Sequence, residues 1–206
     1  MSQSPADWKQ RKLQLRTRAH ANRREQPNKE ALSRSICRRL VELDEYGRAR
    51  TVMAYVDIRD EVRTRHLLAA ILEHGKRLVV PYCVADELEL FLVDNLDELM
   101  PDTLGIPEPK AELRGLAERR VEIEQVDLIV VPGVAFDAGG GRIGHGGGYF
   151  DRLLCLARAD TTLVAPAFEC QIFPDVPMQP HDIFMHMVVT EKTIYRADSE
   201  TSRRET

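Results

Sequence analysis

The pattern of apolar and polar positions divides the chain into alternating helical and extended segments. Residues 27–47 carry apolar side chains at three- and four-residue intervals, and this spacing predicts a helix with a single apolar stripe. Pro27 is expected to open this helix and Gly47 to end it. The stripe consists of Leu32, Ile36, Leu40 and Leu43.

Boundary residues predict two more helices in the N-terminal half. Pro5 begins a polar, basic run that continues to Arg24, and a proline is well tolerated in the first turn of a helix. Thr64 is expected to cap the next helix, and Gly75 to end it. The other predicted elements are a helix over 149–159, a proline-rich loop over 100–109, and strands over 51–56, 77–83, 88–93, 126–133, 162–168 and 187–190.

Strands that alternate with helices at this rhythm predict a single α/β domain with a mostly parallel sheet. Residues 126–133 form a continuous apolar run, which is typical of a central strand covered on both faces. The expected fold is a Rossmann-like three-layer α/β/α arrangement with a helical N-terminus. It is expected to occupy residues 1–197, followed by a polar, disordered tail over 198–206.

Composition removes several function classes. The 206 residues contain no apolar run near the roughly 20 residues that a membrane-spanning helix needs. The four cysteines form no closely spaced pair, which favours reduced thiols in the cytoplasm over a disulfide framework or a zinc site. Residues 1–50 hold 13 Lys and Arg against 6 Asp and Glu, but few aromatic residues accompany them, which disfavours nucleic-acid binding.

A glycine-rich loop over 139–148 holds more than half of the chain's twelve glycines and follows the predicted central strand. Glycines let successive backbone N–H groups converge on an anion, and the helix that follows adds its positive dipole end. Arg142 adds a fixed cation suited to phosphate. The loop therefore predicts a phosphate cradle, with a merely flexible glycine hairpin as the alternative.

Two carboxylates and one histidine near this loop are candidates for chemistry. Asp151 lies in the first turn of the following helix, where it is either a helix cap or a ligand of Mg²⁺, which takes one or two carboxylates plus phosphate oxygens. Asp182 is a second candidate ligand. His145 is a candidate hydrogen-bond donor to phosphate as well as a candidate general base.

The run "VDLIVVPGVAFDAGGGRIGHGGGYFDRLL" resembles the signature of the 5-formyltetrahydrofolate cyclo-ligase family, PG-x-x-F-D followed by R-[LI]-G-x-G-x-G-Y-Y-D. Shorter matches follow the family's order: "KLQLR", "DEVRT", "GIPEP", "PHD" and "VVTE". The resemblance spans about residues 12–191. It implies closure of 5-formyltetrahydrofolate to 5,10-methenyltetrahydrofolate with ATP and Mg²⁺, in one-carbon metabolism.

The resemblance also implies roles for individual residues. Lys12, Arg142 and Tyr149 would be catalytic, and Asp151 and Asp182 would hold magnesium. The implied ATP-binding residues are Lys12, Arg16, Arg142, Gly144, His145, Gly146, Gly147, Gly148, Tyr149 and Phe150. The implied folate-binding residues are Val56, Glu61, His145, Gly146, Gly147, Gly148 and Tyr149.

The chain departs from the family pattern at three positions. Some members carry basic residues where His145 and Gly147 stand, and Phe150 replaces the second tyrosine of the common Tyr-Tyr-Asp. These departures leave open a diverged ATP-dependent paralogue that acts on another heterocycle. A folate- or nucleotide-binding regulatory protein without turnover is the alternative from a different class.

Overall fold

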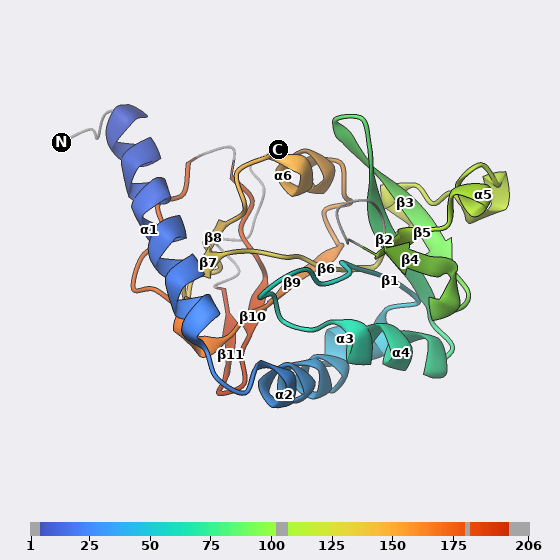
Figure 1. Cartoon of the computed structure of the whole chain (residues 1–206), viewed down its shortest axis with the longest axis horizontal. Coiled ribbons are helices and arrows are strands. Elements are labelled where there is room, and N and C mark those ends of the chain that lie inside the picture. Colours follow the sequence, from blue (N-terminus) through green and yellow to red (C-terminus); the bar gives the residue numbers. More distant parts are fainter. Residues whose placement is uncertain (1–4, 102–106, 180–181, 198–206) are drawn as a thin grey trace.

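A seven-stranded sheet runs through the middle of the protein (Figure 1). The computed structural model describes residues 5–101, 107–179 and 182–197. Neighbouring strands are parallel except at the two edges, where β11 and β3 run antiparallel to their neighbours. The strands, in spatial order, are β11 (Ile194–Arg196), β10 (Met187–Val189), β9 (Thr162–Pro166), β6 (Leu128–Val130), β1 (Thr51–Ala54), β2 (Arg77–Val84) and β3 (Glu87–Val93).

Helices cover both faces of the sheet, which confirms the predicted α/β class. In Figure 1, α2, α3 and α4 lie on one side of the sheet and α6 lies on the other. The α-helices are α1 (Pro5–Glu25), α2 (Lys29–Val41), α3 (Asp44–Arg48), α4 (Arg65–Glu73), α5 (Ala111–Arg114) and α6 (Tyr149–Cys155). Short 3₁₀ turns are η1 (Leu96–Glu98), η2 (Ala117–Arg119), η3 (Ile123–Gln125) and η4 (Glu169–Gln171).

Alternating side chains of the strands supply the two cores. On β1, Val52 and Ala54 are buried in the core beneath α2 and α4, whereas Met53 is buried in the core on the opposite face with Leu154 of α6. This division follows from the two-residue period of a strand. β6 is fully buried and parallel to both of its neighbours, as its continuous apolar run predicts.

The predicted helix over 27–47 is two helices, and its expected boundaries are also wrong, because Asn28 is the N-cap of α2 and Gly47 lies inside α3. Leu43 adopts an extended conformation between α2 and α3, and it is 5% exposed. The break turns the chain so that both Leu43 and Tyr46 of α3 enter the core beneath the sheet. Their burial outweighs the continuation of one helical stripe.

Thr64 does not cap α4 with its side chain. Its hydroxyl donates instead to the carbonyl of Tyr55, at 2.8 Å, and thereby ties the start of α4 to the end of β1. Gly75 ends the helix region with φ of 68°, as predicted.

Several short strands escape the sequence pattern. The segment predicted as a proline-rich loop contains the pair β4 (Leu99–Pro101) and β5 (Pro107–Pro109), and its residues 102–106 lie outside the described part of the chain. A second hairpin pairs β7 (Ala135–Phe136) with β8 (Arg142–Ile143), just before the glycines that follow Ile143. β11 adds a strand at one edge of the main sheet. The predicted tail, 198–206, also lies outside the described residues.

The helix α1 lies beside the hairpin of β7 and β8, which leads into the glycine loop (Figure 1). Asn22 donates to the carbonyl of Cys170 at 2.9 Å, and the buried Arg23 donates to the carbonyl of Gly133 at 3.3 Å. These bonds fasten the C-terminal half of α1 to segments more than 100 residues away. In the described ranges, no helix combines the length and apolarity needed to cross a membrane.

Candidate active site

One cavity, with a volume of about 510 Å³, gathers every site residue predicted from the sequence. It opens where β1 and β2 end, between α1 and the loop that leads into α6. The predicted residues that line it are Lys12, Arg16, Val56, Glu61, Arg142, Gly144, His145, Gly146, Gly147, Gly148, Tyr149, Phe150, Asp151 and Asp182.

The cations of the cavity come from α1 and from β8. Arg16 donates its Nε–H to the carbonyl of Gly144 at 2.9 Å, which joins α1 to the glycine loop. Arg142 is almost fully buried, with a side chain 3% exposed, and one of its Nη atoms donates to the carbonyl of Pro132 at 3.0 Å. Burial lowers the pKa of Arg142, and the charges of Asp151 and Asp182 act in the opposite direction.

The glycine loop uses backbone conformations that other residues adopt only with strain. Gly146 and Gly148 have φ of 105° and 70°, and Gly148 is the N-cap of α6. A Cβ on Gly146 would lie 3.7 Å from the guanidinium of Arg16, so it is the backbone conformation and not crowding that requires glycine here. The loop lies next to Arg16 and Arg142, and a glycine-rich turn that leads into a helix suits an anion such as phosphate.

Each carboxylate proposed as a metal ligand is paired with a cation. Lys12 forms an ion pair with Asp182, and Arg142 forms one with Asp151. The Lys12 and Asp182 side chains are 19% and 14% exposed, so this pair is largely shielded from water. Because Arg142 also interacts with Asp182, the four side chains form a run of alternating charge across the cavity.

In the described part of the chain, no three His, Cys, Asp or Glu side chains gather closely enough to hold a metal ion by themselves. Two aspartates in one cavity are nevertheless a donor set that suits Mg²⁺, which completes its coordination with water and phosphate oxygens. The residues present therefore fit a nucleotide-bound magnesium ion, not a metal held by protein ligands alone.

Glu61 also lines the cavity, with a side chain 6% exposed. One carboxylate oxygen accepts the backbone N–H of Ile58 at 3.1 Å, and the other lies 2.9 Å from Nε2 of His145. Since an ionised carboxylate can only accept, Nε2 of His145 carries the proton.

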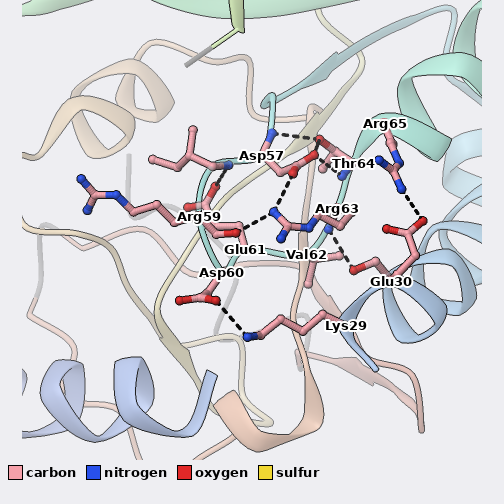
Figure 2. A network of polar contacts seen from close by, with 12 residues as sticks. Lys29, Glu30, Asp57, Arg59, Asp60, Glu61, Val62, Arg63, Thr64 and Arg65 are labelled. Atoms are coloured by element: carbon pink, nitrogen blue, oxygen red, sulfur yellow. Dashed lines mark hydrogen bonds and ion pairs between the residues drawn. The ribbon is translucent and has the colours of Figure 1, made fainter. Parts of the chain in front are cut away.

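A polar network fixes the loop that carries Glu61 (Figure 2). Asp57 accepts the backbone N–H of Thr64 at 2.9 Å and pairs with Arg63 at 3.2 Å. Arg63 also donates to the carbonyl of Arg59 at 2.6 Å, and the Arg59 side chain extends away from this network in Figure 2. The loop thus holds Glu61 in place without help from a ligand.

The sequence did not single out the largely apolar wall of the cavity. Tyr82 donates to Glu89 at 2.6 Å, and burial together with that carboxylate raises the pKa of Tyr82 to about 12. The one signal available was that residues 81–83 end a predicted strand at the edge where ligands bind in parallel sheets. The unpredicted lining residues are Tyr55, Ile58, Pro81, Tyr82, Cys83, Leu88, Pro107, Glu108, Pro132 and Ile143.

Comparison with known proteins places these residues in a wider context. The profile of the 5-formyltetrahydrofolate cyclo-ligase family matches residues 6–191. A 5-formyltetrahydrofolate cyclo-ligase of Mycolicibacterium smegmatis is 34% identical over 188 residues, covering 88% of this chain and 94% of the relative. The Escherichia coli K12 enzyme of the same name is 31% identical over 156 residues, covering 71% and 81%.

A solved structure agrees with the fold over nearly the whole chain. The NMR structure of Aquifex aeolicus 5,10-methenyltetrahydrofolate synthetase superimposes with a TM-score of 0.77 at 34% identity, covering 90% of this chain and 92% of that one. A 5,10-methenyltetrahydrofolate synthetase of Mycoplasma pneumoniae, 22% identical, shares the fold with a TM-score of 0.67.

Proposed function

The chain belongs to the 5-formyltetrahydrofolate cyclo-ligase family, and we propose that the cavity between α1 and the glycine loop is where it closes 5-formyltetrahydrofolate to 5,10-methenyltetrahydrofolate with ATP. The observation that carries this proposal is convergence. Lys12 and Arg16 lie near the N-terminus, Glu61 follows β1, and Arg142 precedes α6, yet all of them line the same cavity.

The reaction needs a leaving group more than it needs a strong nucleophile. The formyl oxygen of the substrate is a poor leaving group, so transfer of the γ-phosphoryl group to it makes departure possible. N10 of the folate then attacks the activated carbon, and inorganic phosphate leaves. The protein contributes positioning and charge stabilisation, as in phosphoryl transfer generally.

Different charged residues of the cavity would bind the two substrates. Lys12, Arg16 and Arg142 would bind the phosphate oxygens together with the loop N–H groups. Glu61, which lines the same cavity, would accept hydrogen bonds from N–H groups of the pterin ring. Tyr149 is the first residue of α6 and lines the same cavity, where its ring would contact the folate.

Magnesium fits the same arrangement. Asp151 and Asp182 would hold the ion together with phosphate oxygens, and the ion would neutralise charge on the transferred group. For this to occur, the phosphates must take over Arg142 and Lys12, which pair with the two aspartates in the free protein. Phosphate and metal would then bind together rather than separately.

We also propose a cytoplasmic location. Cys37, Cys83, Cys155 and Cys170 are all outside disulfides, which suits a reducing compartment. Folate chemistry on a small soluble substrate also requires no membrane.

A direct assay tests the activity. The purified protein is incubated with 5-formyltetrahydrofolate, ATP and Mg²⁺, and the near-ultraviolet absorbance of the methenyl product is followed. We expect product only when nucleotide and a divalent metal are both present, with one ADP released per methenyl group. Turnover without nucleotide, or no turnover under any folate and metal condition, would contradict the proposal.

A further inference from the structure

The environment of Glu61 shows what a substrate must displace. Its carboxylate is almost wholly buried. One oxygen accepts the backbone N–H of Ile58, in the loop that carries Glu61, and the other is bound by Nε2 of His145, in the glycine loop. The imidazole is the accessible partner, since the His145 side chain is 44% exposed. A ligand that donates to Glu61 therefore meets His145 first.

His145 is built to move while its backbone stays in place. Its side chain extends from a loop that Arg16 anchors at the carbonyl of Gly144 and that Arg152 anchors at the carbonyl of Gly147, at 3.2 Å. The imidazole also lies near the tilted ring of His20, with centroids 5.5 Å apart. Rotation of the side chain alone would uncover the carboxylate.

We propose that, in the free protein, His145 occupies the carboxylate oxygen of Glu61 that accepts a hydrogen bond from the pterin ring. His145 leaves this oxygen when the substrate binds. His145 is then a positioning and specificity-determining residue: it stabilises the buried carboxylate between turnovers, and it admits only ligands whose N–H groups replace its own. This inference rests on the proposed function, because it takes the ligand of Glu61 to be the folate's pterin ring.

The energetic consequence is a lowered affinity for the substrate. Only the fraction of molecules in which His145 has released Glu61 can bind, and the apparent affinity falls by that fraction. Removing the competing hydrogen bond should therefore tighten binding even though it deletes a residue of the site. Loss of a residue that simply contacts the substrate would have the opposite effect.

Binding of 5-formyltetrahydrofolate without nucleotide, measured by calorimetry, tests the proposal. We expect His145→Ala to bind about three to ten times more tightly than the wild type. His145→Leu keeps bulk but no hydrogen bond and should bind as tightly as the alanine variant. If steric exclusion were the cause, His145→Leu would bind as the wild type does, which would contradict the proposal.

A matched control lies outside the cavity. His66 forms the same kind of contact with Glu30, at 2.8 Å, so His66→Ala removes a His–Glu pair without touching the site, and its folate affinity should equal the wild-type value. A second measurement needs no variant: the ¹⁵N resonance of His145 Nε2 should shift when folate saturates the wild-type protein.

Two results would overturn the inference: unchanged or weaker folate binding by His145→Ala, or an imidazole resonance that does not respond to folate. Failure of the proposed function looks different. In that case the wild-type protein itself binds no 5-formyltetrahydrofolate and forms no methenyl product with ATP and magnesium. A protein that binds and turns over, with His145→Ala identical to wild type, rejects only the role of His145.

Discussion

At the scale of single residues, several charged side chains of the cavity pair with one another before any ligand arrives. Lys12 pairs with Asp182, Arg142 with Asp151, and Glu61 with His145. A buried charge without a partner costs several kcal/mol, so an empty site made only of phosphate-binding cations would be unstable. Ligands therefore exchange with internal partners, and the affinity reflects the difference between the two sets of contacts.

Glu61→Gln tests the carboxylate on the folate side. The amide oxygen can still accept from Ile58, but its NH₂ group would face the N–H donors of the pterin, as it would face His145 in the free protein. Loss of a charged hydrogen bond of this kind costs about 1.5–3 kcal/mol, so we expect the folate KM to rise tenfold or more while the ATP KM changes little. Glu30→Gln, outside the cavity, is the control variant. An unchanged folate KM in Glu61→Gln would place Glu61 outside the site.

Cysteine alkylation gives an independent measure of occupancy. Burial raises the pKa of Cys37 to about 12 and that of Cys170 to about 11, so both should react slowly at pH 8, where the thiolate is the reactive form. Cys83 and Cys155 are exposed, and only Cys83 lines the cavity. Mass spectrometry after iodoacetamide treatment should show folate protecting Cys83 and leaving Cys155 unprotected; equal labelling of both at saturating folate would contradict this.

How much of the site could be predicted depends on how close together its residues lie in the sequence. The glycine run and Arg142 form a contiguous signature, so their chemistry can be inferred without a structure. Lys12 and Glu61 were assigned only through short motifs and the family's order. The partners of these residues could not be predicted, because the pairing of Lys12 with Asp182 joins positions 170 residues apart that no local pattern connects.

At the scale of elements, the existence of an element was predictable where a long run of the chain has one character, and short elements were not predictable. The apolar run over 126–133 does contain a strand, but β6 covers only Leu128–Val130 of it, whereas the helix predicted after Pro5 is confirmed as α1. β11 has three residues and β7 has two, too few to show an alternation. The break at Leu43 arises from tertiary burial, which a helical stripe does not encode.

Asp127 joins two parallel strands at their starts and makes the stability of the sheet depend on pH. One of its oxygens accepts the backbone N–H groups of Arg50 and Thr51, both at 2.9 Å, and the other accepts from Arg158. Burial acts to raise the pKa of Asp127, but these donors outweigh it and hold the pKa below the ordinary 3.8. Because the folded pKa is the lower one, the stabilisation is complete above pH 3.8 and is lost as the pH falls through the folded value.

We expect Asp127→Asn to lower the free energy of unfolding at pH 7 by about 1–2 kcal/mol, since charged hydrogen bonds are replaced by neutral ones. The difference from wild type should shrink below pH 3.8, where the wild-type carboxyl also loses its charge. Urea unfolding at several pH values measures both effects. As a control, Asp160→Asn removes an exposed partner of the same Arg158 and should change the free energy of unfolding by less than about 0.5 kcal/mol. A loss of unfolding free energy in Asp127→Asn that does not depend on pH would contradict the charge argument.

At the scale of the whole molecule, α1 brings the basic N-terminal segment to a loop that lies far along the chain. The excess of positive charge in residues 1–50 is used in part here, where Arg16 and Lys12 face the cavity. Other basic residues of α1 serve the fold: Arg23 is buried against Gly133, and Arg11 pairs with Asp175 on the surface. A composition count could not separate these uses, because it does not say which face of the helix each residue occupies.

The two ends of the site can be separated by a magnesium titration of variants. Asp151→Asn is nearly isosteric and keeps an acceptor for Arg142, but it removes a charged ligand of the metal. Its defect in ATP use should be partly relieved by excess Mg²⁺, because a weakened binding equilibrium responds to concentration. Lys12→Ala leaves phosphate charge unpaired at any metal concentration, so its raised ATP KM should persist across the titration. Arg11→Ala, on the same helix and outside the cavity, should behave as wild type.

The competing interpretation makes Asp151 only a helix cap, stabilising the start of α6 by about 0.3–1 kcal/mol through the helix dipole. Asp151→Asn would then lower the melting temperature slightly and leave activity intact at every magnesium concentration. ATP-dependent turnover of the three variants, measured from low to saturating Mg²⁺, distinguishes the two accounts. Metal-insensitive behaviour of Asp151→Asn would remove Asp151 from the metal site. Recovery of Asp151→Asn without recovery of Lys12→Ala would instead assign the metal to the α6 side of the cavity and phosphate binding to α1. The reason is that only an equilibrium that includes the metal can respond to its concentration.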